Sequence, residues 1–426
     1  MNVKLPYGDE AVTAVLAGCE PPRVLDISDA PEVANLDSAI RESLRRPIDL
    51  STPVARVVRP GESVAILVSD SFRQTRIDRV LPILVAEFEE AGVSPERIRF
   101  VFATGTHRGP TEPEARNILG DAIYDRFRGQ ILSHDPWTPS ELTFVGTTSR
   151  GTKVSINRRV YECDRIIATG SVVMHYFGGY GGGRKSVVPG VASAETIAHN
   201  HALNLDPESD RLNPAVRIGA MEGNPVAEDM LEGTKLVGVD AIVNTVLNRK
   251  GQIAGIFAGE LEAAHAAACT FARSICAVPL ERPADLVIAA SPHTRNFVQT
   301  HKALFNANLA VRPGGRIVLL APCPEGIGGE QFVKWLRLED RAAIIRALRK
   351  QSEINGQTAL STIEKGPHTL MVTGMPEDDV RLLRARKEPS FQAAIDTALA
   401  ELRANGAARP TVCIMPSAAY SVPILA

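Results

Sequence analysis

The chain has 426 residues, of which 44% are hydrophobic and 23% charged, and its formal net charge is −2. This length allows two domains, each large enough to bury a core without disulfides. The near-neutral charge excludes the basic tracts typical of nucleic-acid-binding proteins, so small molecules are the expected partners. No signal-peptide pattern and no apolar run of membrane-spanning length is present, so we expect a cytoplasmic protein.

Cysteine spacing gives no sign of a disulfide framework or a zinc site. The six cysteines show no C-x-x-C pair and no metal-type spacing with histidine. We expect them to be reduced and mostly buried.

Short apolar runs alternate with amphipathic stretches in the first half of the chain. Residues 63–70 and 98–107 predict buried strands, and residues 76–92 predict the helix between them. Further strands are predicted at 163–172 and 240–248. This alternation is typical of parallel βαβ units.

A more polar segment, residues 120–160, predicts an insertion or edge element with a hairpin near 149–153. An alanine-rich helix is predicted at 261–277, and a second cycle of alternation follows it. Strands of this cycle are predicted at 284–294, 314–323, 368–374 and 410–418, and helices at 297–310, 339–350 and 389–404.

These elements predict an α/β protein of two domains, residues 1–278 and 279–426, each with a mostly parallel sheet flanked by helices. Ligands of such sheets gather outside the carboxyl ends of the strands. The polar residues that follow the predicted strands, among them Asp70 and His107, are therefore candidates for a site, which we expect in the cleft between the domains.

Residues 174–190, MHYFGGYGGGRKSVVPG, contain the ingredients of a phosphate-binding loop. Arg184 separates Gly183 from Lys185, however, so the Walker spacing fails by one residue. Glycine amides and two cations suit a phosphate or carboxylate, and a lysine in a confined site can act as a nucleophile. The alternative is a flexible surface lid with a solvated arginine and lysine.

Three histidines lie where strands or glycine-rich segments would deliver a side chain to a site: His107, His175 and His201. We interpret His134, His265 and His368 as structural residues. The HNH run at 199–201 could provide one imidazole ligand to a metal held mostly by another group, and the pattern leaves open whether His199 or His201 serves.

Two further groups could hold an anionic substrate. Arg73 is placed to clamp a carboxylate, although an exposed charge at a helix start is an equal interpretation. Gln299 and Lys302 lie three residues apart on one face of a predicted helix, where a solvated face explains them equally well.

Taken together, these motifs occur in the order and approximate spacing of a known family. The motifs are SDSFR at 69–73, GTHRGPT at 105–111, the glycine-rich 174–190, NH at 200–201 and QTHK at 299–302. In this pattern the chain resembles the nickel-dependent, LarA-like lactate racemase family. The resemblance implies a racemase or epimerase that inverts C2 of a 2-hydroxy acid by reversible hydride transfer, through a 2-keto acid.

The resemblance also implies a cofactor, a nickel-pincer nucleotide derived from nicotinic acid and carrying thioamide and thiocarboxylate sulfurs. By motif, Lys185 corresponds to the lysine that tethers it and His201 to the protein ligand of nickel. His107 and His175 correspond to a pair of acid/base histidines, one for each face of the substrate. Cofactor-biosynthesis proteins would be needed for loading.

The remaining site residues are assigned by the same resemblance. Arg73, Gln299 and Lys302 would orient the substrate. The group expected to contact the ribose and phosphate of the cofactor comprises Asp70, Gly181, Gly182, Gly183 and Arg184.

Two departures from the family pattern bear on the substrate. Val298 stands where the family has a tyrosine, and the proline usual after the arginine is absent from RQTRID. We therefore expect a short 2-hydroxy acid with an apolar side chain somewhat larger than that of lactate, with malate or a sugar acid as alternatives. Oligomeric state is open, with a homodimer as one option.

Three rival functions follow from the same residues. A nucleotide-dependent enzyme would use the glycine loop, and a non-catalytic protein would bind the nickel cofactor or an organic acid. An ordinary NAD dehydrogenase is disfavoured because no strand is followed by G-x-G-x-x-G with an acidic residue about twenty positions on.

Overall fold

The computed structural model describes residues 1–338 and 340–425 and divides into two compact units. The terminal unit comprises Met1–Ser28, Ser209–Arg211 and Cys276–Ala426, and the central unit comprises Asp29–Glu208 and Leu212–Ile275. Residue 339, which begins the predicted helix 339–350, and residue 426, which ends the second predicted domain, lie outside the described residues.

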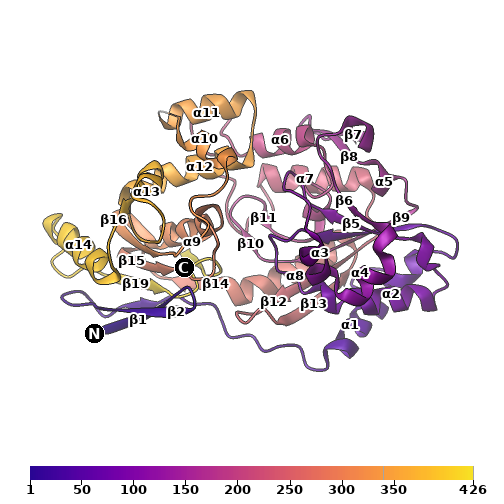
Figure 1. Ribbon diagram of the computed structural model, residues 1–426, viewed down its shortest axis with the longest axis horizontal. Helices are drawn as coiled ribbons and strands as arrows, with labels where there is room; N and C mark the ends of the chain where they lie inside the picture. Colours follow the sequence, from indigo (N-terminus) through magenta and orange to yellow (C-terminus); the bar gives the residue numbers. More distant parts are fainter. Residues whose placement is uncertain (339, 426) are drawn as a thin grey trace. The chain divides into compact units, whose positions relative to one another are not determined.

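The central unit is built on a six-stranded sheet in the order β13-β12-β9-β4-β5-β6, in which only the β12–β13 pair is antiparallel (Figure 1). Its strands are β4 (Val64–Ser69), β5 (Ile98–Ala103), β6 (Ile131–Ser133), β9 (Arg165–Ser171), β12 (Ala241–Leu247) and β13 (Ile253–Gly259). Every residue of β4 is buried, as expected for a strand covered on both faces.

Alternate residues of β4 pack into two different cores, because successive side chains of a strand point to opposite faces. On one face lie α1 (Leu36–Arg45), α2 (Leu81–Glu90), α3 (Glu112–Leu119) and α4 (Asp121–Phe127). On the other lie α5 (Arg158–Tyr161), α6 (Ala194–Ala202), α7 (Pro225–Val237) and α8 (Leu261–Cys276). The predicted strands and helices of this region are confirmed.

Two antiparallel hairpins complete the central unit. The pair β7 (Leu142–Thr147) and β8 (Lys153–Asn157) encloses the turn predicted near 149–153. The pair β10 (Met174–His175) and β11 (Gly179–Tyr180) lies within the glycine-rich segment. Short 3-10 helices in the unit are η1 (Val54–Val57), η2 (Ile77–Arg79), η3 (Pro95–Arg97), η4 (Arg128–Gln130), η5 (Pro139–Glu141) and η6 (Gly183–Ser186).

The terminal unit contains a second six-stranded sheet, wholly parallel, in the order β18-β17-β16-β15-β19-β3. Its strands are β3 (Arg23–Val24), β15 (Ala284–Ala290), β16 (Val311–Leu320), β17 (Thr369–Val372), β18 (Arg386–Lys387) and β19 (Val412–Met415). Two smaller pairs are β1 (Asn2–Tyr7) with β2 (Glu10–Val15), and β14 (Ala277–Leu280) with β20 (Val422–Leu425).

Helices of the terminal unit are α9 (Phe297–Ala310), α10 (Glu330–Leu336), α11 (Arg341–Lys350), α12 (Ile354–Lys365), α13 (Glu377–Leu382) and α14 (Phe391–Ala404), with the 3-10 helix η7 (Gly366–His368). The β1–β2 hairpin and α14 cover one face of the sheet and form a core with alternate residues of β15 and β16 (Figure 1). The four strands and three helices predicted for this half are found.

The division of the chain differs from the predicted boundary at residue 278. Residues 1–28 belong with the C-terminal residues because Arg23 and Val24 pair with Cys413 and Ile414 in the terminal sheet. A two-residue strand and a short hairpin carry no βαβ pattern, so no sequence signal separates residues 1–28 from the first predicted domain.

Two composition-based expectations can be compared with the structure. The cysteines form no disulfide, and all are buried except the partly exposed Cys19, which confirms the expectation. Among residues 1–338 and 340–425, no helix combines the length and apolarity that crossing a membrane requires.

Candidate active site

Asp70 and His107 form a hydrogen-bonded pair at the carboxyl ends of β4 and β5. Oδ2 of Asp70 lies 2.7 Å from Nδ1 of His107, and its Oδ1 accepts a bond of 3.1 Å from the Phe72 backbone N–H. An ionised carboxylate can only accept, so Nδ1 of the imidazole carries the hydrogen. The Nε2 atom of His107 is thereby left with a lone pair, on a side chain that is 43% exposed.

The surroundings of Asp70 keep it ionised although it is only 2% exposed. Burial by itself raises the pKa of this carboxyl, but the hydrogen bond from His107 and the charge of Arg73 outweigh burial and hold the pKa below its usual value. Both oxygens of Asp70 are engaged within the chain. The carboxylate therefore orients His107, and the contact of Asp70 with the cofactor remains a prediction.

Three side chains surround this pair. The Phe72 ring, 46% exposed, meets the His107 ring edge-on with centroids 4.9 Å apart, and the Arg108 guanidinium lies 5.7 Å from the Phe72 centroid. Arg108 is itself paired with Glu114 at 2.6 Å. The exposed Arg73, by contrast, makes no ion pair with any carboxylate in the described part of the chain.

His175, on β10, has the opposite hydrogen arrangement to His107. Its Nδ1 accepts bonds of 3.2 Å and 3.1 Å from the backbone N–H groups of Phe177 and Gly178. The neutral ring therefore carries its hydrogen on Nε2. Its ring is stacked on Tyr176, with centroids 4.9 Å apart.

Two glycines of the loop are required by close approach. At Gly182 (φ 68°) a Cβ would lie 2.5 Å from the Asn244 Oδ1, and at Gly183 (φ 49°) it would lie 2.7 Å from the His265 ring. The Gly183 backbone N–H donates to the same Asn244 oxygen at 3.1 Å. The loop is thus seated on β12 and α8, as expected of a segment with one fixed shape.

Arg184 points into the protein and is 1% exposed. Its guanidinium donates to the carbonyl oxygens of Gly178 (2.5 Å) and Ala227 (3.2 Å) and lies 3.5 Å from Nδ1 of His265. Burial lowers the pKa of Arg184 to about 10. The alternative of a solvated cation is therefore wrong for Arg184, whereas its predicted contact with the cofactor remains a prediction. Arg184 thus joins the Gly178 carbonyl of the loop to the Ala227 carbonyl of α7.

His265 supports the same loop from α8. Its Nε2 lies 2.8 Å from the Gly181 carbonyl oxygen, and burial, followed by the charge of Arg184, lowers its pKa to about 4. The ring is therefore neutral at physiological pH and donates to the carbonyl. This agrees with its interpretation as a structural histidine.

His201 lies at the end of α6, beside Lys185. The helix begins after Ser193, whose side chain accepts from the Thr196 N–H, and it carries His201 to within 4.6 Å of the Phe177 ring. Burial, and next the charge of Lys185, lowers the pKa of His201 to about 3, so the imidazole is neutral. His199 is instead exposed, with Nδ1 2.8 Å from Oγ1 of Thr152. The position of His201 near Lys185 favours it over His199, and its role as a nickel ligand remains a prediction.

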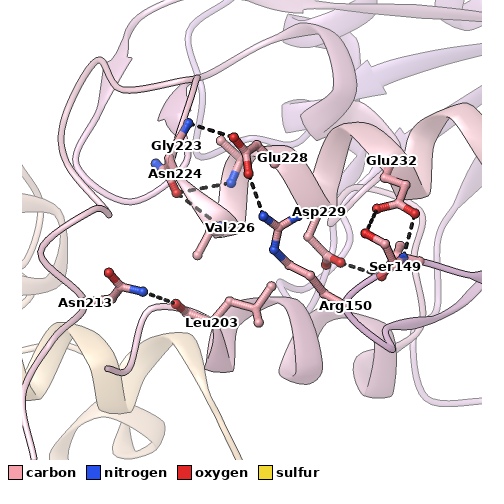
Figure 2. A network of polar contacts seen from close by, with 12 residues as sticks. Ser149, Arg150, Leu203, Asn213, Gly223, Asn224, Val226, Glu228, Asp229 and Glu232 are labelled. Carbon is pink, nitrogen blue, oxygen red and sulfur yellow. Dashed lines mark hydrogen bonds and ion pairs between the residues drawn. The ribbon is translucent and has the colours of Figure 1, made fainter. Parts of the chain in front are cut away.

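A polar network that the sequence did not indicate supports α6 from α7. Asp229 is 1% exposed, and its carboxylate accepts bonds from the Thr148 hydroxyl (2.5 Å), the Thr152 hydroxyl (2.8 Å) and the Asn200 amide (2.9 Å). Figure 2 shows the surrounding polar contacts between the β7–β8 turn and α7. Isolated Thr and Asn residues 29 to 81 positions from the aspartate carry no recognisable pattern.

Gln299 and Lys302 lie on α9 of the terminal unit. The Gln299 side chain accepts a bond of 3.0 Å from the Arg295 backbone N–H, and Lys302 is exposed. Between them, His301 is buried, with Nε2 3.0 Å from the Ser361 hydroxyl, to which Lys365 also donates. The substrate-orienting roles of Gln299 and Lys302 remain predictions.

The comparison with protein families decides the family. The model described as lactate racemase N-terminal domain matches residues 7–212, and the model described as lactate racemase C-terminal domain matches residues 280–416. The chain belongs to the lactate racemase family. The resemblance inferred from the motifs is therefore confirmed.

Relatives of known name agree with this membership in the lactate racemase family. A lactate racemase from Lactiplantibacillus plantarum is 31% identical over 338 residues, covering 78% of this chain and 77% of its own length. A lactate racemase from Thermoanaerobacterium thermosaccharolyticum is 29% identical over 348 residues, covering 79% and 78%.

Solved structures show the same fold. The lactate racemase apoprotein from T. thermosaccharolyticum matches with a TM-score of 0.87 and 25% identity, covering 100% of both chains. A protein from Thermotoga maritima matches with a TM-score of 0.68 and 18% identity, covering 94% of this chain and 100% of its own. The predicted α/β class is confirmed.

Proposed function

We propose that this chain is an isomerase that inverts the C2 centre of a 2-hydroxy acid, as a racemase or epimerase. The observation that carries the proposal is the Asp70–His107 pair, which leaves a lone pair on Nε2 of the partly exposed His107, in a chain of the lactate racemase family. A lone pair held in this way can take the proton of a substrate hydroxyl. Asp70 then stabilises the imidazolium that forms.

The residues around Lys185 fit the nickel-pincer nucleotide that the family resemblance implies. Lys185 would tether the group, and the neutral, buried His201 beside it would provide an imidazole ligand to nickel. At the glycine loop, the buried Nδ2 of Asn244 has no hydrogen-bond partner among the described residues, so a donor is available to an oxygen of the bound group. When bound, such a group would supply a reversible acceptor for the hydride of C2.

The chain's own residues divide the remaining work. His107 accepts the hydroxyl proton at Nε2 and gives it back when the C2 centre is restored. Arg73, which has no carboxylate partner in the described chain, binds the substrate carboxylate, and we assign Gln299 and Lys302 to the same task. His175 presents an Nε2–H, which donates to the substrate oxygen on the other face.

The hydrogen bonds at His175 restrict how this residue could take the hydroxyl proton from the other enantiomer. To accept a proton at Nε2, His175 must carry a hydrogen on Nδ1, which would then face the N–H groups of Phe177 and Gly178. Acceptance of a proton by His175 therefore requires this turn to move. We infer that His107 serves one enantiomer from the described arrangement and that His175 serves the other after a local rearrangement.

The apolar surface beside His107 favours a substrate with an apolar side chain. Phe72 lies against the imidazole. Independently, the family resemblance aligns Val298 with a tyrosine, and valine offers no hydroxyl to a substrate. We propose a 2-hydroxy acid whose side chain is larger than the methyl of lactate. Malate and gluconate, which carry a second carboxylate or several hydroxyls, are the test cases against this choice.

The proposal is tested on protein made in a host that synthesises the nickel cofactor. Intact-mass spectrometry should show an adduct on Lys185, nickel should co-purify, and each enantiomer of 2-hydroxybutyrate or phenyllactate should racemise. Active protein with an unmodified Lys185 and no nickel would refute the cofactor assignment. Binding of the organic acid without racemisation, unchanged in His107→Ala and His175→Ala, would favour a non-catalytic binding protein.

A further inference from the structure

The buried carboxylate of Asp229 has no cationic partner in the described part of the chain. Its three hydrogen-bond donors, Thr148, Thr152 and Asn200, are all neutral, and no Lys, Arg or His nitrogen lies within ion-pair distance of it. A buried charge of this kind is costly unless hydrogen bonds compensate it. The presence of an aspartate at this buried position therefore needs an explanation other than packing.

Holding the β7–β8 turn does not explain it, because neighbouring residues already do so. The Ser149 backbone N–H and hydroxyl donate to Glu232 at 2.6 Å and 2.7 Å, and Arg150 pairs with Glu228 at 2.6 Å. Figure 2 shows these contacts on either side of Asp229, along the same helix α7. What Asp229 adds to this set is a link to α6.

That link holds the last turn of α6 through two consecutive residues. Asn200 donates to Asp229 directly, and Thr152, which donates to Asp229, accepts from Nδ1 of His199. Consecutive residues of an α-helix point about 100° apart. Fixing the directions of His199 and Asn200 therefore fixes the direction in which the Cα–Cβ bond of His201 leaves the helix, and contact with the Phe177 ring then limits the orientation of the imidazole.

The Asn200 amide is itself held in one orientation at a cost. Its Nδ2 donates both to Asp229 and to the Val226 carbonyl oxygen at 3.1 Å, whereas its buried Oδ1 has no hydrogen-bond partner among the described residues. A buried acceptor without a partner is unfavourable, so the two donated bonds determine this orientation.

We propose that Asp229 is a positioning residue, which acts through Asn200 and the Thr152–His199 contact to keep the imidazole of His201 facing Phe177 and Lys185. The positioning of the ring is a property of the chain alone. Its consequence for nickel rests on the proposed function. Groups that orient a metal-binding histidine typically change metal affinity 10- to 100-fold when they are removed.

The test uses Asp229→Asn, with Glu232→Gln as the matched control, because Glu232 holds the same turn from the same helix without reaching α6. The first readout is the ¹³C–¹H signal of the His201 ring in full-length protein without cofactor, assigned with His201→Gln and shifted by the Phe177 ring 4.6 Å away. The second is nickel retention by protein from the cofactor-making host. Asn200→Ala serves as a second variant that keeps the Asp229–threonine bonds.

We expect the His201 signal to move in Asp229→Asn and Asn200→Ala but not in Glu232→Gln, and nickel retention to fall about 10- to 100-fold in the first two. An unmoved signal in these variants, an equal movement in Glu232→Gln, or wild-type nickel retention would overturn the proposal. If wild-type protein takes up neither nickel nor an adduct on Lys185, the proposed function fails. The ring signal then still decides whether Asp229 positions His201.

Discussion

Replacing Asp70 with asparagine distinguishes two roles of this residue. The sequence predicts that Asp70 contacts the cofactor, and the structure shows that it orients His107. The carboxylate orients His107 through a 2.7 Å bond to Nδ1, and it is ionised despite its burial. Asparagine has nearly the same shape but no charge, and its amide can donate to Nδ1. The hydrogen of the imidazole then moves to Nε2, where His107 can no longer accept a proton.

The expected loss follows from the strength of that bond. A hydrogen bond to a charged group contributes about 1.5–3 kcal/mol. His107 is 43% exposed, so solvent weakens the attraction between the carboxylate and the imidazolium, and the lower part of this range, about 1.5–2 kcal/mol, applies to the transition state. This corresponds to a fall in kcat of roughly 13- to 30-fold. KM should change little, because Asp70 faces His107 rather than the substrate.

The assay is polarimetric racemisation of a 2-hydroxy acid by cofactor-loaded Asp70→Asn, with intact mass and nickel content measured on the same sample. The matched control is Asp78→Asn, which removes a carboxylate of the following 3-10 helix that pairs with Arg76. Full occupancy of Lys185 with a reduced kcat supports the orienting role. Loss of the adduct at an unchanged kcat per loaded site would refute the orienting role and would indicate that Asp70 contacts the cofactor.

Three other substitutions test separate features. Burial lowers the pKa of Lys365 to about 8. Between pH 8 and 10.5 the lysine is therefore protonated in the unfolded chain but neutral in the folded chain, so the free energy of unfolding rises with pH. Lys365→Met should therefore stabilise the protein by about 1–3 kcal/mol at pH 7, an advantage that denaturant titrations should find lost above pH 10.5. Gly183→Ala would place a Cβ 2.7 Å from His265, and it should lower Tm more than Gly223→Ala, whose φ is also positive but whose added Cβ would have no atom within 4 Å. Equal losses of Tm would mean that backbone strain alone is responsible. Phe72→Ala should reduce kcat/KM for phenyllactate about tenfold relative to lactate, and an unchanged ratio in competition assays would exclude Phe72 from the substrate surface.

The sequence predicted the parallel βαβ organisation because buried strands such as 63–70 read as continuous apolar runs. The sequence also predicted that His107 and Lys185 belong to a site, because the glycine and turn residues around them can be recognised locally. The direction of a side chain was not predictable in the same way. Arg184 and Lys185 are adjacent in the chain, yet Arg184 turns inward to carbonyls that become available only when the loop and α7 come together.

The Asp70–His107 bond and the Asp229 network lay beyond the sequence for a related reason. Each joins residues that follow different strands or helices, and their pairing depends on strand order, which spacing alone does not specify. Interaction of Asp70 with His107 could have been suspected from the adjacency of β4 and β5, because parallel strands end at one edge of the sheet.

The placement of the first 28 residues bears on how the chain folds as it is synthesised. Strand β3 leaves the ribosome early, yet its partner β19 is translated only near the end of the chain. The central unit has all its strands once residue 275 has emerged, whereas the terminal sheet must wait for the last segment. We expect nascent chains arrested after residue 275 to protect the central unit from protease while the N-terminal residues remain cleavable.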